Sequence, residues 1–230
     1  MFFSLIRMDL TVLETLLVLL ALILIYMIAL TFHEWAHAIT AYKQGDLTPK
    51  IAGRLTLNPY RHLSFWGFLC FMIAGIGWAK PVPVNPIQFK HYRSGIAKVS
   101  IAGVLANFVL MIVSSFFYCL LNNLVGSINT FMWILILFFR WSMQINAFLI
   151  ILNLLPIYPL DGFNFISSFL KSDNKFVQFN IRNCFKIIFT IIIVDIIIEL
   201  FAGFSLLDYC LTNLSYFLYR PFELLWNLII

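Results

Sequence analysis

The sequence predicts an all-α protein that crosses a membrane several times. Of its 230 residues, 62% are hydrophobic and only 11% are charged, which is the composition of a polytopic membrane protein. Residues 15–32 and 99–139 contain no charged side chain, and stretches of this length predict transmembrane helices. We therefore expect one membrane-embedded domain over residues 1–230, with a core at about 10–170 and further membrane helices at 185–230.

The first membrane helix is expected at residues 10–42, because residues 10–32 are apolar apart from Glu14. The next segment is less regular. Around residues 55–57 the pattern favours a short β-strand. Residues 65–79 are uncharged but number only fifteen, which is short for a span, and the proline-rich residues 81–86 favour an extended chain. We interpret 65–86 as a re-entrant or interfacial hairpin, so a short cytoplasmic β/re-entrant segment separates the first two spanning helices.

Further helices are expected at 98–121, from about 129 to 155, and at about 185–205. Asp195 and Glu199 lie four residues apart in the last of these, and they either bond to neighbouring groups or line a substrate gate. Residues 209–230 form a final short span or a helix lying in the interface. The count is about five transmembrane helices.

The motif at the end of the first helix carries the chemistry. His33, Glu34 and His37 form an H-E-x-x-H pattern, which places two histidines on one helix face, one turn apart. Two such histidines can hold a metal ion, with the glutamate as general base. Short motifs of this kind also occur by chance in soluble proteins, but ionisable groups at membrane depth are costly and usually functional.

The positive charges predict the orientation. Loops 43–64, 80–98 and 171–186 hold twelve of the fifteen lysines and arginines, so the positive-inside rule places all three loops in the cytoplasm. Residues 65–79 must then dip into the membrane and return. At helical rise, His33, His37 and Asn107 lie roughly 9–15 Å below the cytoplasmic surface. We expect a multi-pass protein of the cell membrane whose active site faces the cytoplasm. The net charge of +5 reflects this topology, and no nucleic-acid partner is expected.

Five stretches then match one family: residues 33–37, 53–59, 77–86, 102–107 and 153–162. With them the chain resembles the site-2 protease family of intramembrane metalloproteases, in its small bacterial and archaeal form without PDZ or CBS domains. The resemblance implies that Zn²⁺ is held by His33, His37 and Asp161 and that Glu34 is the catalytic base. It also implies that Asn107 and Asn153 position substrate or stabilise the oxyanion.

The sequence therefore predicts an intramembrane zinc metalloprotease whose partners are a transmembrane protein substrate and the lipid bilayer. The alternatives are a non-cleaving zinc-binding membrane protein, such as a transporter or an inactive scaffold, and a membrane-anchored protease that cleaves soluble proteins. The four scattered cysteines are expected to be isolated thiols, and His62 and His91 are expected at the surface. The sequence indicates no oligomeric state.

Overall fold

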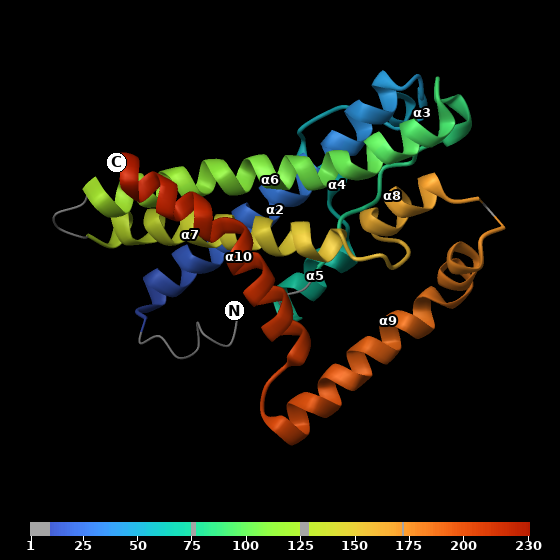
Figure 1. Cartoon of the computed structure of the whole chain (residues 1–230). Coiled ribbons are helices and arrows are strands. Elements are labelled where there is room, and N and C mark those ends of the chain that lie inside the picture. Colours follow the sequence, from blue (N-terminus) through green and yellow to red (C-terminus); the bar gives the residue numbers. More distant parts are fainter. Residues whose placement is uncertain (1–9, 75–76, 125–128, 172) are drawn as a thin grey trace.

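The computed structural model describes residues 10–74, 77–124, 129–171 and 173–230, and within these ranges it is built from helices without any strand (Figure 1). The helices are α2 Val12–Lys43, α3 Thr48–Ile51, α4 Pro59–His62, α5 Phe65–Ala74, the 3₁₀ turn η1 Pro86–Gln88, α6 Tyr92–Leu124, α7 Thr130–Asn153, α8 Asp161–Phe169, α9 Lys175–Ala202 and α10 Leu206–Ile229.

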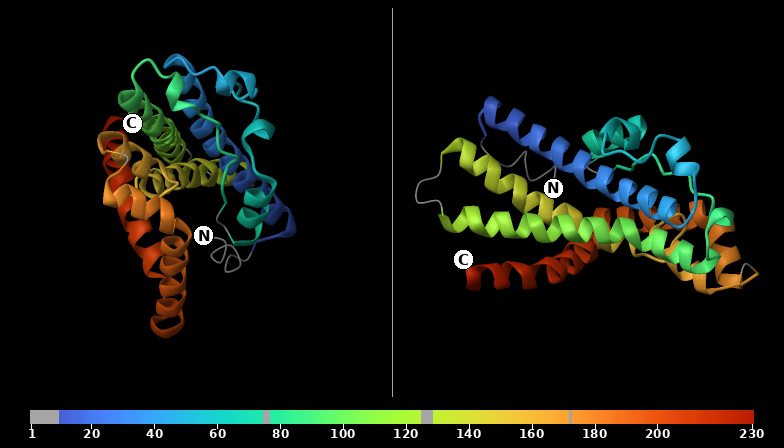
Figure 2. Two further views of the ribbon diagram at one scale, coloured as in Figure 1. Left: turned by 90° about the vertical axis from the view of Figure 1, so that its right-hand side faces the viewer. Right: turned by 90° about the horizontal axis from the view of Figure 1, so that it is seen from above.

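Helices α2, α6 and α7 pack against one another and form the centre of the molecule (Figures 1 and 2). Apolar side chains of α2, α5 and α7 make one core cluster, and those of α6, α7 and α10 make a second. Helix α8 packs on α6. The start of α2 is fixed by a capping box in which Thr11 and Glu14 each bond the other's backbone N–H.

Three of the described helices, α2, α6 and α7, are long and apolar enough to cross a membrane, and α9 with α10 makes a fourth if the two are one broken span. About five spans were expected. The difference lies in α9 and α10, which meet at a bend of 99°. Gly203 ends α9 in the left-handed conformation (φ 76°), and the Asp195 carboxylate then accepts hydrogen bonds from the Ser205 hydroxyl and the Leu207 N–H. Asp195 thus fixes the start of α10, whereas Glu199 is exposed.

The strand expected at residues 55–57 is not formed. In place of a partner strand, the Thr56 carbonyl accepts a hydrogen bond from His62, and Asn58 caps α4. Side chains thus provide hydrogen bonds to the backbone around residues 56–60. The alternating pattern covers only three residues, which is too short to specify a strand. The basic segment 171–186 is also more helical than expected, since α9 begins at Lys175.

The region expected to be a hairpin returns on itself. Helix α5 has ten residues, and Leu63 before it forms an antiparallel bridge with Ala79 after it. The Lys80 N–H also donates to the His62 carbonyl (2.7 Å). A Cβ on Gly67 would collide with the Trp78 backbone, so glycine is required where α5 meets the returning chain.

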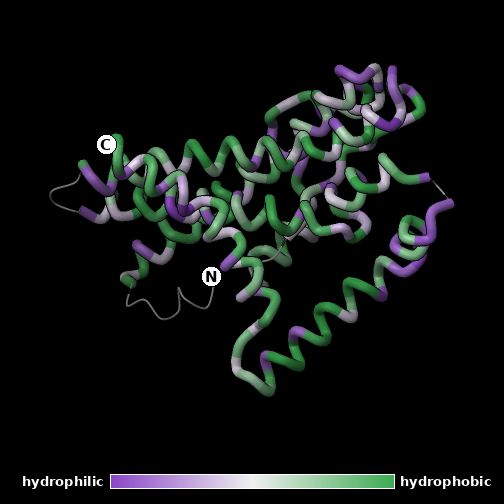
Figure 3. Tube along the Cα trace, viewed as in Figure 1, coloured by the Kyte–Doolittle hydropathy of each residue, from purple (hydrophilic) through white to green (hydrophobic). Residues whose placement is uncertain are grey.

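One end of the bundle is polar. Helix α3, the start of α6, the end of α8 and the start of α9 lie at this end. The end of α6 and the start of α7 lie at the opposite end (Figures 1 and 2). Hydrophilic residues gather around α3 and the start of α6, while the long helices are mostly apolar (Figure 3). With three to four candidate spans, the chain is a multi-pass membrane protein.

Candidate metal centre

The H-E-x-x-H residues lie on the buried face of α2. His33, Glu34 and His37 are 6%, 9% and 8% exposed. Gly103 of α6 lies directly against the two imidazoles: a Cβ at this position would collide with His37 Nε2 and lie 2.6 Å from His33 Cε1. The absence of a side chain at Gly103 therefore lets α6 cover the histidine pair.

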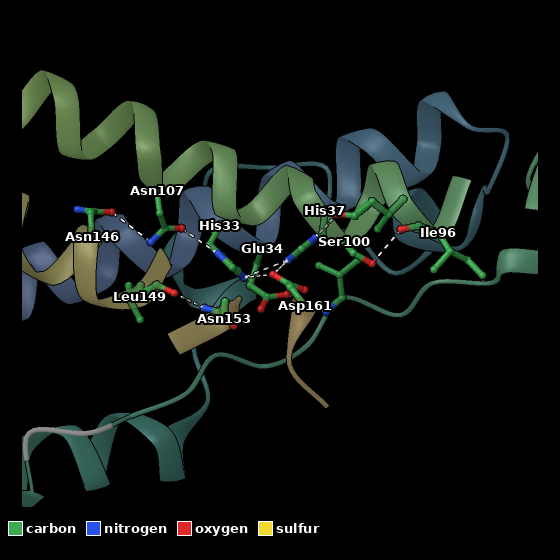
Figure 4. Close-up of polar contacts among 12 residues, drawn as sticks. His33, Glu34, His37, Ile96, Ser100, Asn107, Asn146, Leu149, Asn153 and Asp161 are labelled. Carbon is green, nitrogen blue, oxygen red and sulfur yellow. Dashed lines mark hydrogen bonds and ion pairs between the residues drawn. The ribbon is translucent and has the colours of Figure 1, made fainter. Parts of the chain in front are cut away.

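Asp161 completes a cluster of three donors (Figure 4). Its Oδ2 atom lies 3.3 Å from His33 Nε2 and 3.2 Å from His37 Nε2, and the two Nε2 atoms are 3.0 Å apart. Asp161 is the first residue of α8, and Gly162 after it packs against the Leu154 carbonyl so closely that a Cβ would collide with it. The break between α7 and α8 thus brings the Asp161 carboxylate to the two histidines of α2.

The hydrogen bonds of the histidines leave their Nε2 lone pairs free for a metal. His37 Nδ1 lies 2.7 Å from the Val99 carbonyl, which can only accept, so Nδ1 carries the proton. His33 Nδ1 faces Asn107 Oδ1 at 2.9 Å. Two Nε2 lone pairs then converge with Asp161 Oδ2, which is buried without a hydrogen-bond donor. A bound cation would satisfy all three of these donor atoms. Two imidazoles and one carboxylate are a ligand set that suits zinc.

The charge of the cluster is also consistent with a cation site. Burial raises the pKa of the Asp161 carboxyl, but the positive charge of a protonated His37 and hydrogen bonds from protonated Nε2 atoms of His33 and His37 lower this pKa below its usual value. A cation bound at the two Nε2 atoms would replace these protons and would likewise favour the charged carboxylate. The three residues offer one donor atom each, all within 4.8 Å of one another.

Glu34 is not one of the three donors of this cluster. Its Oε2 atom accepts a hydrogen bond from the Val82 N–H (2.9 Å), which belongs to the extended chain between α5 and η1. The carboxylate is thus held beside the three donors by a backbone group. Such a contact leaves the second carboxylate oxygen available for a proton.

Two buried charged residues hold this extended chain in place. The Arg54 guanidinium donates to the Lys80 and Pro81 carbonyls, and the Asp46 carboxylate accepts from the Asn85 N–H at 2.7 Å. Burial lowers the pKa of Arg54, and the negative charge of Glu34 opposes that change. Arg54 and Asp46 together fix both ends of the stretch that reaches Glu34.

His62 was expected at the surface, and that expectation is wrong. Its side chain is fully buried and its Nε2 lies 2.7 Å from the Thr56 carbonyl, to which it donates. His62 therefore ties the turn before α4 to the return of the hairpin. No sequence signal distinguished it from His91, which is exposed as expected.

The two asparagines of the predicted site differ in their surroundings (Figure 4). Asn107 is completely buried, with its oxygen on His33 and its NH₂ on Asn146 Oδ1 (3.2 Å). Asn153 is the last residue of α7 and is partly exposed, and its NH₂ donates to the Leu149 carbonyl. Asn146 was not singled out from the sequence, although a polar residue within an apolar membrane helix is itself a signal.

Three curated relatives each match about two thirds of this chain. A Bacillus subtilis protein with the name "Putative zinc metalloprotease YwhC" is 43% identical over 147 residues, which cover 63% of this chain and 67% of that protein. The chain belongs to the site-2 protease family. The family resemblance of the sequence motifs is thereby confirmed.

Other site-2 protease relatives are more distant. Rip2 of Mycolicibacterium smegmatis, which carries the same zinc metalloprotease designation, is 32% identical over 158 residues, and Rip2 of Mycobacterium tuberculosis is 28% identical over 158 residues. The aligned part spans 57% of the length of each Rip2 protein. No protein-family profile and no solved structure matches the chain.

Proposed function

We propose that the chain is an intramembrane zinc metalloprotease that hydrolyses peptide bonds of membrane-spanning protein substrates. The observation that carries this proposal is the convergence of His33, His37 and Asp161, with donor atoms within 4.8 Å of one another, on the buried face of an apolar helix. Glu34 of the same motif lies beside them. Zinc metalloproteases combine two histidines of this motif, a third protein ligand and a glutamate base.

His33, His37 and Asp161 would hold the zinc ion, with one donor atom each. When bound, it supplies Lewis-acid chemistry that polarises a carbonyl and lowers the pKa of water. Glu34 takes the proton of the attacking water and passes it to the leaving amine. The Val82 N–H orients the Glu34 carboxylate for this transfer, because it occupies one oxygen and restricts rotation of the side chain.

The asparagines have separate roles in this proposal. The Asn153 amide, at the open end of α7, stabilises the oxyanion or positions substrate. Asn107 contacts His33 Nδ1 and so orients the imidazole that would bind the metal.

The substrate must unwind near the site, since a helix hides its carbonyl groups. The re-entrant hairpin at 65–86 brings an extended chain to Glu34, where an unwound substrate can lie beside it. In this proposal the loops at 43–64 and 80–98 are cytoplasmic, residues 1–230 form one protease domain in the cell membrane, and the site opens to the cytoplasm.

The test uses purified protein in liposomes together with a single-span membrane substrate. The wild type should cleave the substrate, and a chelator should stop the cleavage. Glu34→Gln should retain zinc and lose cleavage, because Glu34 is a base and no ligand. Cleavage by Glu34→Gln would refute this role. A wild type that binds zinc but cleaves none of a panel of membrane-spanning substrates would favour the non-cleaving alternative.

A further inference from the structure

We propose that Asn146 is a positioning residue that fixes the tautomer of His33 through Asn107. The inference rests on the zinc site proposed above and adds a residue whose hydrogen bonds involve none of the three metal donors. Asn146 belongs to α7 and Asn107 to α6, whereas His33 belongs to α2. The three central helices are thus linked by one line of hydrogen bonds (Figure 4).

The contacts of this line are short and buried. Asn146 Nδ2 donates to the Ser142 carbonyl at 2.8 Å. Asn107 Nδ2 donates to Asn146 Oδ1 at 3.2 Å, and Asn107 Oδ1 lies 2.9 Å from His33 Nδ1. Asn146 and Asn107 are 1% and 0% exposed. Water therefore does not compete for these groups, and each amide depends on its protein partners.

The direction of the hydrogen bonds in this line follows from the contact between Asn146 and Ser142. The Ser142 oxygen is a backbone carbonyl and can only accept, so Asn146 must present its NH₂ to it and its oxygen to Asn107. Asn107 must then present its NH₂ to Asn146 and its oxygen to His33. His33 Nδ1 consequently carries the proton, and Nε2 keeps the lone pair that a metal needs.

Without Asn146, the orientation of the Asn107 amide would be undetermined. A flipped amide would donate to His33 Nδ1 and favour the tautomer with the proton on Nε2, which cannot bind a metal. His37 needs no such relay, because the Val99 carbonyl contacts its Nδ1 directly. Outer partners of a metal-binding histidine commonly change metal affinity by about 10–100-fold.

The competing explanation is that Asn146 only joins α6 to α7, as polar residues in membrane helices often do. The same interface contains a contact of that kind, between the hydroxyls of Ser114 and Ser142 at 2.8 Å. Ser114 lies seven residues, or two turns, beyond Asn107 on α6 and does not contact His33. Ser114→Ala is therefore a matched control for loss of a polar contact between these helices.

The experiment measures zinc affinity by chelator competition on the purified full chain in detergent, with thermal unfolding of the zinc-free protein as a second readout. Asn146→Leu and Asn107→Leu should each weaken zinc binding by about 10–100-fold, and Ser114→Ala should leave it unchanged. The double variant Asn107→Leu/Asn146→Leu should match Asn107→Leu alone, because Asn146 acts only through Asn107.

Wild-type zinc affinity in Asn146→Leu would overturn the inference, and so would additive losses in the double variant. A second measurement avoids substitution: nitrogen NMR of ¹⁵N-histidine in the zinc-free wild type should show a proton on His33 Nδ1. An unprotonated Nδ1 would overturn the relay. If the wild type bound no zinc at all, the proposed function would fall, and the NMR measurement would still decide the relay.

Discussion

Adding one methyl group to α6 at Gly103 should weaken zinc binding strongly. In Gly103→Ala the new Cβ would collide with His37 Nε2 and lie 2.6 Å from His33 Cε1 and 2.7 Å from His37 Cε1, whereas ordinary van der Waals contact begins at 3.4 Å. The rings must therefore move by most of an ångström, while zinc–ligand distances tolerate only about 0.2 Å.

We expect zinc affinity to fall by about 100-fold, which corresponds to about 2.7 kcal/mol. The overpacking itself should cost about 1–3 kcal/mol of folding free energy. Zinc content and affinity are measured on purified protein, with Val109→Ile as the control, because Val109 lies on the same helix and is 58% exposed. A Gly103→Ala protein that binds zinc like the wild type would show that the histidine pair does not hold the metal in this geometry.

Three further predictions concern the ligand, the base and the topology. Asp161→Asn should lose most of its zinc, whereas Asp195→Asn should keep it, since Asp195 only caps α10. If metal analysis showed the reverse, Asp195 would be the third ligand in place of Asp161. Val82→Pro removes the N–H that bonds Glu34 and should lower kcat about 10–100-fold, or about 1.4–2.7 kcal/mol, with zinc content unchanged. Val82→Ala keeps this N–H and should be active; equal activity of the two variants would exclude this contact from catalysis. Single cysteines at positions 50 and 90 should both resist an impermeant thiol reagent in intact cells, and labelling at 90 alone would mean that 65–79 spans the membrane.

The long helices were predictable because their apolar stretches exceed the thickness of a bilayer. The expected helix 10–42 agrees with α2 at Val12–Lys43. Within the uncharged stretch 99–139, residues 99–124 lie in α6 and residues 130–139 lie in α7. Asp161 was indicated by the family resemblance, which assigns it to the metal, and its carboxylate lies beside both histidines. All four cysteines are free, as expected.

The contacts that orient the site were not predictable. Glu34 bonds a backbone N–H of Val82, and every residue except proline has such a donor, so side-chain chemistry gives no signal. Asn146 was visible as a polar residue in an apolar helix, but the sequence did not indicate that its partner is Asn107. The bend between α9 and α10 depends on the Asp195 cap, which forms only because the chain reverses at Gly203.

The position of the cut in a membrane-spanning substrate tests the central claim most directly. A single-span protein with soluble domains on both sides would be incubated with the wild-type enzyme in liposomes, and the fragment masses would be determined by mass spectrometry. We expect one cut inside the apolar segment, near its cytoplasmic end, at the depth of His33 and His37. Cuts confined to the soluble flanking chain would contradict intramembrane proteolysis and would instead indicate a membrane-anchored protease of soluble segments.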